Sequence, residues 1–123
     1  MLTLVLAGGE GTRLAPLTQR CAKSMLPFAG RRLIDYTLLN CQRSGLRDVV
    51  VLTQSHADEV QGYLEHSWCT RLDGLGCLSS RDAGRLYRGT ADAVRAALEW
   101  APRTDYVLVL ASDHVYRMDY RRM

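Results

Sequence analysis

The chain has 123 residues, of which 47% are hydrophobic and 24% are charged. This length fits one domain, and the composition is typical of a folded protein rather than a disordered one. Sixteen Lys and Arg against thirteen Asp and Glu leave a net charge of +3, too small by itself to indicate nucleic-acid or membrane binding. The longest apolar runs, residues 2–7 and 106–111, fall far short of the roughly 20 residues that span a bilayer. The first run also lacks the basic segment of a signal peptide, so we expect a cytoplasmic protein with no membrane and no nucleic-acid partner.

The cysteine and histidine spacings do not match a metal site. The four cysteines are separated by 20, 28 and 8 positions, which fits neither paired CxxC motifs nor a zinc-ligand pattern, and the three histidines complete no such pattern. These residues are Cys21, Cys41, Cys69, Cys77, His56, His66 and His114. We therefore expect reduced, mostly buried thiols and no zinc site.

The first half of the chain alternates strand and helix signals. Leu2–Leu6 is apolar without polar alternation, as in a strand that is buried on both faces. A helix is predicted over residues 33–44, because apolar side chains repeat there at helical spacing and Gly45 follows at the position of a left-handed C-cap. Asp48–Leu52 is predicted as a second buried strand.

The second half continues the alternation. Ser55 is the predicted N-cap of a helix with an apolar stripe, and a weak apolar run at Leu75–Leu78 is a candidate strand. The strongest helical pattern covers Thr90–Ala101, with Thr90 as its predicted N-cap. Tyr106–Leu110 is predicted as the last strand. Strands that alternate with helices indicate an α/β fold, in which a parallel sheet carries helices on both faces and binds ligands at the carboxyl ends of its strands.

A glycine cluster directly follows the first strand. Gly8, Gly9 and Gly11 let backbone N–H groups surround an anion, and Arg13 adds a charged fork that suits phosphate. The motif is not the dinucleotide fingerprint, because a leucine replaces the third glycine, and it is not a P-loop. We interpret it as a phosphate cradle to which Lys23 also contributes; the alternative is a tight turn that happens to contain an arginine.

Two further candidate sites follow later strands. At the entry of the strong helix, Gly89 leaves room for a flat ring against the backbone, although an ordinary helix entry has the same pattern. Asp113 comes just after the last strand, where a carboxylate suits Mg²⁺, although a surface aspartate in a turn fits equally well. All three sites are expected at one edge of one sheet.

The motifs together resemble the glucose-1-phosphate adenylyltransferases of the sugar-nucleotide pyrophosphorylase family. The resemblance rests on the segments Leu6–Leu14, Lys23, Ile34–Tyr36, Leu39–Cys41, Leu52–Gln54, Tyr87–Val94 and Asp113–Tyr120. It implies a Rossmann-like three-layer sandwich with a mostly parallel sheet, the nucleotidyltransferase fold similar to GT-A. It also implies that residues 1–123 form the N-terminal, nucleotide-binding part of a nucleotidyltransferase domain.

The resemblance assigns a role to each matching position. Arg13, Lys23 and Asp113 would be catalytic, Asp113 would hold Mg²⁺, Tyr87 would help to form the sugar-nucleotide site, and Arg20 and Arg32 fall near anionic-effector positions. The nucleotide-binding residues would be Leu6, Ala7, Gly8, Gly9, Gly11, Thr12, Gly89, Thr90 and Ala91. Ser24 and Ser112 depart from the family pattern, which has proline and glycine at these positions.

The implied reaction makes ADP-glucose and pyrophosphate from ATP and glucose 1-phosphate, as in glycogen and starch synthesis. The family's later, sugar-binding half is absent from these 123 residues, so we expect a truncated chain that binds nucleotide without turnover on its own. The alternatives are a non-catalytic nucleotide-binding or regulatory relative, and a pyrophosphorylase for another sugar nucleotide. The last strand would leave an unpaired sheet edge, which favours a homo-oligomer or association with a partner subunit.

Overall fold

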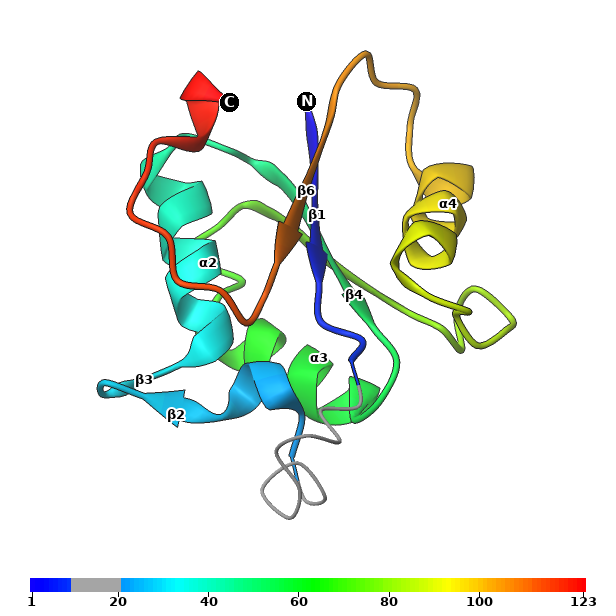
Figure 1. The fold of residues 1–123 in the computed structure, drawn as a ribbon, viewed down its shortest axis with the longest axis horizontal. Helices are drawn as coiled ribbons and strands as arrows, with labels where there is room; N and C mark the ends of the chain where they lie inside the picture. The colour runs from blue at the N-terminus through cyan, green and yellow to red at the C-terminus, as the bar shows by residue number, and fades with distance from the viewer. Residues whose placement is uncertain (10–20) are drawn as a thin grey trace.

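The computed structural model describes residues 1–9 and 21–123. In this part of the chain, one parallel sheet has the strand order β5-β4-β1-β6 (Figure 1). Its strands are β1 (Leu2–Leu6), β4 (Asp48–Thr53), β5 (Gly74–Ser79) and β6 (Val107–Ala111). All four predicted strands are confirmed, including the weak apolar run that becomes β5.

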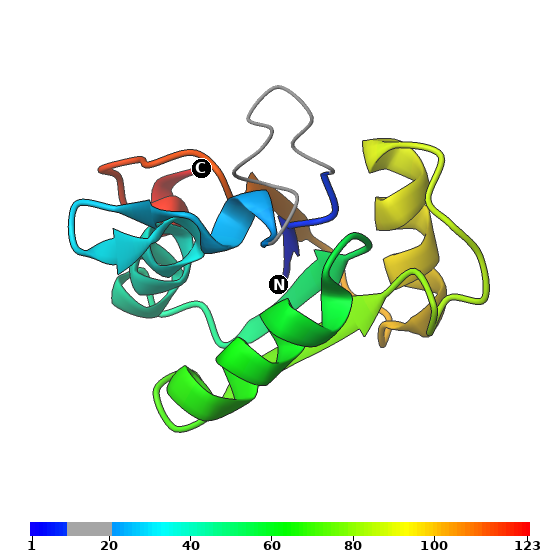
Figure 2. The ribbon, with the colours of Figure 1, turned by 90° about the horizontal axis from the view of Figure 1, so that it is seen from below.

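Helices cover both faces of this sheet, as the alternating pattern predicts. Helices α2 (Leu33–Arg43) and α3 (Ala57–Ser67) lie on one face, and α4 (Thr90–Trp100) lies on the other (Figure 2). Short elements complete the described fold, namely η2 (Lys23–Met25), the hairpin of β2 (Pro27–Phe28) and β3 (Arg31–Arg32), and η3 (Tyr120–Arg122). The predicted three-layer α/β sandwich is thus confirmed.

The helix ends differ from two predictions. The N-cap of α3 is His56 rather than Ser55, and the N-cap of α4 is Gly89 rather than Thr90, which is already the first helical residue. No side-chain hydrogen bond caps α4 at Gly89, but the Asp92 carboxylate in the first turn accepts the backbone N–H of Arg88, just before the helix, at 3.0 Å. The predicted left-handed position after α2 is confirmed, with Gly45 at φ 71°.

The larger core lies between the sheet and helices α2 and α3. It contains Leu38 of α2 and the fully buried Trp68 just after α3. A buried carboxylate, Asp35, joins these two helices by accepting the Tyr63 hydroxyl at 2.7 Å and the Trp68 indole N–H at 2.8 Å. Asp35 also accepts the backbone N–H of Arg32 at 2.9 Å, which completes a capping box at the start of α2. This face of the sheet is therefore held by both apolar packing and a buried polar centre.

The cysteines are less buried than expected. All four are thiols, but only Cys41 is buried, Cys69 is exposed, and Cys21 and Cys77 are intermediate. Burial raises the pKa of the Cys41 thiol to about 12, so this side chain behaves as a small core residue. In the described residues, no helix has the length and apolar character that a membrane crossing requires.

Candidate functional site

A cavity of about 480 Å³ lies at the carboxyl ends of β1, β4 and β6. This is the edge at which a parallel α/β sheet binds its ligands. The cavity brings together nine of the residues selected from the sequence, which are Leu6, Ala7, Gly8, Gly9, Lys23, Tyr87, Gly89, Thr90 and Asp113. The predicted convergence of three separate motifs on one site is therefore seen in the structure, while the role of each residue stays a prediction.

The glycine segment after β1 forms one wall of the cavity. The backbone N–H of Ala7 donates to Leu52 O at 2.8 Å, which holds the end of β1 against β4. A Cβ added at Gly8 would come within 3.4 Å of the Gln54 Cβ, whereas one added at Gly9 would meet nothing within 4 Å. A Cβ at Gly8 would thus be in ordinary van der Waals contact with the segment after β4. Gly11, Thr12 and Arg13 of the predicted cradle lie outside the described residues.

Lys23 and Asp113 meet across the cavity although they are far apart in the sequence. The Lys23 ammonium lies 2.7 Å from Asp113 Oδ2, and both side chains are about one-third exposed. Lys23 begins η2, whereas Asp113 follows β6 by two residues, so two different layers of the fold supply the pair. Lys23, the predicted phosphate-neutralising cation, and Asp113, the predicted metal ligand, therefore neutralise each other's charge.

The ion pair controls the protonation of Asp113. Burial pushes the pKa of the Asp113 carboxyl upward, but the hydrogen bond and charge of Lys23 outweigh it, so the pKa lies below its usual value of 3.8. His114 Nδ1 lies 3.5 Å from the other carboxylate oxygen, Oδ1. Asp113 is therefore ionised at neutral pH and available to a cation.

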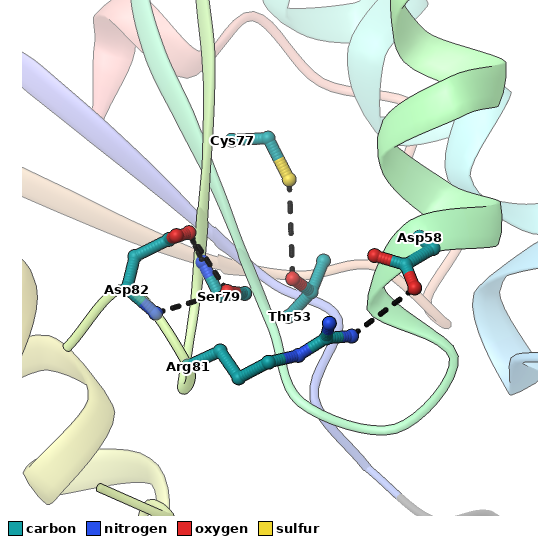
Figure 3. Close-up of polar contacts among 6 residues, drawn as sticks. All are labelled: Thr53, Asp58, Cys77, Ser79, Arg81 and Asp82. Atoms are coloured by element: carbon teal, nitrogen blue, oxygen red, sulfur yellow. Dashed lines mark hydrogen bonds and ion pairs between the residues drawn. The ribbon is translucent and has the colours of Figure 1, made fainter. Parts of the chain in front are cut away.

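The opposite wall is the connection between β5 and α4. At its start, the Asp82 carboxylate accepts the backbone N–H of Ser79 at 2.9 Å and the Ser79 hydroxyl at 2.7 Å, and the Ser79 hydroxyl accepts the Asp82 N–H (Figure 3). These bonds hold the pKa of Asp82 below its usual value. Arg81 reaches back to Asp58 of α3 at 3.2 Å, and both side chains are largely exposed. The turn after β5 is thus fixed mainly by its own polar groups.

The same connection carries Tyr87 into the cavity wall. The backbone N–H of Tyr87 donates to Gln54 Oε1 at 2.7 Å, which joins the connection to the end of β4. Two residues before Tyr87, Arg85 pairs with Asp92 of α4 at 2.5 Å, and this hydrogen bond lowers the pKa of Asp92. The Tyr87 ring packs against the core beneath α4, and burial raises the pKa of its hydroxyl.

The structure leaves open space beside Gly89, the residue before α4. Its φ of 159° is one that L side chains rarely adopt, and an added Cβ would meet nothing within 4 Å. The cavity is therefore open beside this glycine, at the first turn of α4. Thr90 lines the cavity as well, whereas Ala91 does not, because successive residues of a helix point in different directions.

Arg32, a predicted effector residue, does not line this cavity. The Arg32 guanidinium donates to Met25 O at 3.3 Å and stacks 4.6 Å from the centre of the Tyr63 ring. Arg20 lies outside the described residues. No effector contact follows from the geometry of Arg32.

Six cavity residues were not selected from the sequence as site residues. They are Ser24, Leu52, Gln54, Ala93, Ala111 and Ser112. Four of these are neighbours of selected residues in the chain or in the sheet. Their position next to a motif could have predicted that they line the site. Gln54 and Ala93 are the exceptions. Ala93 lies one turn into α4, and the contact of Gln54 with the Tyr87 backbone joins segments 33 positions apart.

The donor groups fit a magnesium ion that arrives together with a ligand. Among the described residues, no group of three or more His, Cys, Asp and Glu side chains gathers at one point. Of the cavity residues in the described part of the chain, Asp113 is the one that offers a carboxylate. Mg²⁺ commonly binds one or two carboxylates and completes its shell with water and substrate phosphates, so one carboxylate beside a phosphate-sized space is a plausible donor set.

The fold and the cavity define a parallel α/β protein whose ligand site lies at the carboxyl ends of its strands. A model of the nucleotidyl transferase family matches residues 2–123, and the chain belongs to this family. It is 46% identical to glucose-1-phosphate adenylyltransferase 2 of Vibrio vulnificus strain YJ016 over 132 residues, which cover 100% of this chain and 33% of the relative. Glucose-1-phosphate adenylyltransferase of Paraburkholderia phytofirmans is 42% identical over 99% of this chain and 31% of its own length. The chain thus spans about a third of the curated relatives that it matches.

Solved structures share the same fold. A Bacillus anthracis structure described as a glucose-1-phosphate thymidylyltransferase, in complex with sucrose, has a TM-score of 0.80 at 22% identity, with coverage of 99% of this chain and 48% of that one. HddC from Yersinia pseudotuberculosis, complexed with GMP-PN, has a TM-score of 0.82 at 18% identity, with coverage of 98% and 51%. At these identities the likeness concerns the fold alone.

Proposed function

We propose that this chain is the nucleotide-binding part of a glucose-1-phosphate adenylyltransferase and that its cavity binds ATP with Mg²⁺. The observation that carries the proposal is the convergence on one cavity of the glycine segment with Lys23, the open backbone at Gly89, and Asp113. Sequence identity of 42–46% to relatives named glucose-1-phosphate adenylyltransferase supports ATP and glucose 1-phosphate as the substrates of the whole protein.

The two ends of the cavity suit the two ends of a nucleotide. Backbone N–H groups after β1 and the Lys23 ammonium favour the triphosphate. The space beside Gly89 favours the flat base. Arg13, from the sequence motif, is expected to add a second cation near the phosphates.

The Lys23–Asp113 pair links the binding of the nucleotide to the binding of the metal. At 2.7 Å, each group satisfies the other's charge. A triphosphate attracts Lys23, and Mg²⁺ attracts Asp113, so the two ligands together replace both halves of the pair. Bound Mg²⁺ would supply neutralisation of phosphate charge. We therefore propose that nucleotide and metal bind much better together than separately.

The proposed reaction forms ADP-glucose and pyrophosphate. An oxygen of glucose 1-phosphate attacks the α-phosphorus of ATP in line, and pyrophosphate leaves. Such a transfer needs no protein nucleophile, because positioning and charge neutralisation by Arg13 and Lys23 lower the barrier. The groups that hold the sugar phosphate would come from the part of the relatives that this chain does not span. The proposal places the reaction in glycogen or starch synthesis, in a cytoplasmic protein.

We also propose association with a second copy or a partner subunit. In the described sheet, β6 forms one edge, and Val107 and Val109 on this strand are 37% and 41% exposed. An edge strand with half-exposed valines favours contact with another chain.

Isothermal titration of the chain with ATP and with GTP, each with and without Mg²⁺, tests the proposal. We expect binding that depends on Mg²⁺ and favours ATP. Asp113→Asn should weaken binding and remove the Mg²⁺ dependence, because the neutral amide is a poor magnesium ligand. Lys23→Met should weaken binding by about 10- to 150-fold, since a charge-assisted contact contributes about 1.5–3 kcal/mol.

Asp58→Asn is the matched control, because this exposed aspartate pairs with Arg81 away from the cavity. It should leave ATP binding unchanged. Failure of the folded wild-type chain to bind ATP would reject the proposal, and a preference for GTP would point to a pyrophosphorylase for another sugar nucleotide.

A further inference from the structure

Three buried side-chain oxygens in the described part of the chain have no hydrogen-bond partner. They are Thr3 Oγ1, Ser24 Oγ and Tyr87 Oη. A buried hydroxyl without a partner is unfavourable, and native proteins keep few of them without a reason such as a ligand. Ser24 and Tyr87 line the cavity, whereas Thr3 does not. Two unpartnered hydroxyls therefore belong to cavity residues. The resemblance already gives Tyr87 a role, so the hydroxyl of Ser24 is the one of these two that has no explanation.

The local structure fixes Ser24 in the cavity wall. Ser24 is the middle residue of η2 and is 2% exposed. The backbone N–H of Met25 donates to Ala22 O at 2.9 Å, and that of Leu26 donates to Lys23 O at 3.2 Å, so this turn is closed on both sides of Ser24. The Met25 side chain, also 2% exposed, anchors the turn in the larger core. The backbone of Ser24 is therefore held in place by its surroundings.

The neighbouring charges indicate what this hydroxyl would bind. Lys23 precedes Ser24 in the same turn, and its ammonium reaches Asp113 across the cavity. A hydroxyl in the wall of the cavity that also holds a cation suits a ligand atom that is anionic and accepts hydrogen bonds. A phosphoryl oxygen meets both requirements, whereas a ribose hydroxyl gains nothing from the cation.

We infer that the Ser24 hydroxyl donates a hydrogen bond to a phosphoryl oxygen of the nucleotide, next to the contact made by Lys23. This inference rests on the proposed function, because it names a further contact in the same nucleotide site. Rotation about the Cα–Cβ bond of Ser24 moves its Oγ between staggered positions. The contact therefore requires a change of side-chain rotamer and no movement of η2.

Calorimetric titration of Ser24→Ala and wild type with Mg²⁺·ATP and with adenosine tests the inference. We expect the variant to bind Mg²⁺·ATP about 3- to 10-fold more weakly, which corresponds to the loss of one hydrogen bond. Adenosine, which has the base and ribose but no phosphate, should bind both proteins equally. The melting temperature of the empty variant should stay the same or rise, because the substitution removes an unpartnered hydroxyl.

Thr3→Val is the matched control. Thr3 carries the same kind of unpartnered buried hydroxyl, in β1 and away from the cavity. Its replacement should leave the affinity for both ligands unchanged. If Ser24→Ala proves too unstable to titrate, Ser24→Cys keeps a side chain of similar size with a much weaker donor and should weaken Mg²⁺·ATP binding in the same direction.

The outcomes separate this inference from the proposed function. Equal affinity of wild type and Ser24→Ala for Mg²⁺·ATP would overturn the inference and leave the proposed function standing. Equal weakening of ATP and adenosine binding would also overturn it, because the lost contact would then not be to phosphate. Absence of ATP binding by the wild type would reject the proposed function and this contact together.

Discussion

The two faces of the sheet are covered to very different extents. In the described residues, the core between the sheet and α2 and α3 contains 17 buried residues. The core beneath α4 contains five. The register pairs Val107 and Val109 of β6 with Leu2 and Leu4 of β1, so these half-exposed valines lie on the α4 face, because side chains of paired residues share one face of a sheet.

The two faces therefore contribute differently to stability and to the ligand site. The α2 and α3 face supplies most of the apolar burial and therefore most of the stability. The α4 face supplies one wall of the cavity through the connection after β5, which is held by hydrogen bonds and ion pairs rather than by a large core. The ligand site is thus built where the fold has the least apolar packing.

The largest predicted effect compares one leucine from each face. Leu38 of α2 is fully buried, whereas Leu98 of α4 is 44% exposed. Leu38→Ala should lower the free energy of unfolding by about 2–5 kcal/mol, because it leaves a cavity in the core. Leu98→Ala should lower it by less than about 1 kcal/mol. Urea denaturation measures both, and similar losses would contradict the assignment of stability to one face.

The next effect concerns the buried carboxylate between α2 and α3. Asp35→Ala leaves the Tyr63 hydroxyl and the buried Trp68 indole N–H without their acceptor. We expect a loss of about 2–3 kcal/mol in the free energy of unfolding, because buried donors without partners are costly. Asp35→Asn, which keeps one acceptor oxygen, should lose less. Denaturation of both variants checks this order. An unchanged free energy of unfolding in Asp35→Ala would contradict a stabilising role for this carboxylate.

The sequence predicts the layers of this fold well for a physical reason. Strands buried on both faces appear as short apolar runs, and Leu2–Leu6 and Asp48–Leu52 match the observed β1 and β4 to within one residue. Once the parallel sheet is inferred, the carboxyl ends of its strands must meet at one edge. The convergence of the glycine segment, Gly89 and Asp113 on one cavity follows from that topology.

Contacts between side chains and distant backbone could not be predicted in the same way. Nothing local to Gln54 reveals that its amide accepts the N–H of Tyr87. The same holds for the unpartnered hydroxyl of Ser24, because its burial depends on Met25 and on the packing of η2. The prediction of Thr90 as the N-cap of α4 is wrong because threonine is a favourable cap in general, whereas this helix already includes Thr90 and has Gly89 as its N-cap.

The smallest predicted effect is a change in the titration of Asp113. Its lowered pKa means that the Lys23 pair stabilises the fold above the usual value of 3.8 and that this contribution is lost as the pH falls through the lower, folded value. In Lys23→Met, burial remains while the charge and hydrogen bond of Lys23 are gone, so the pKa of Asp113 should rise relative to that in the wild type. The carboxyl ¹³C shift of Asp113, followed by NMR against pH, measures both values. An unchanged pKa in the variant would show that Lys23 does not pair with Asp113 in solution.

The central claim is that the cavity at the carboxyl ends of the strands binds a nucleotide while the α2 and α3 face stays unchanged. Backbone and indole NMR spectra of the ¹⁵N-labelled chain, recorded during titration with Mg²⁺·ATP, test it directly. We predict saturable shifts for the amides of Gly8, Gly9, Gly89 and Asp113 and none for the buried Trp68 indole. Shifts confined to α2 and α3, or no shifts in a folded chain, would contradict the account.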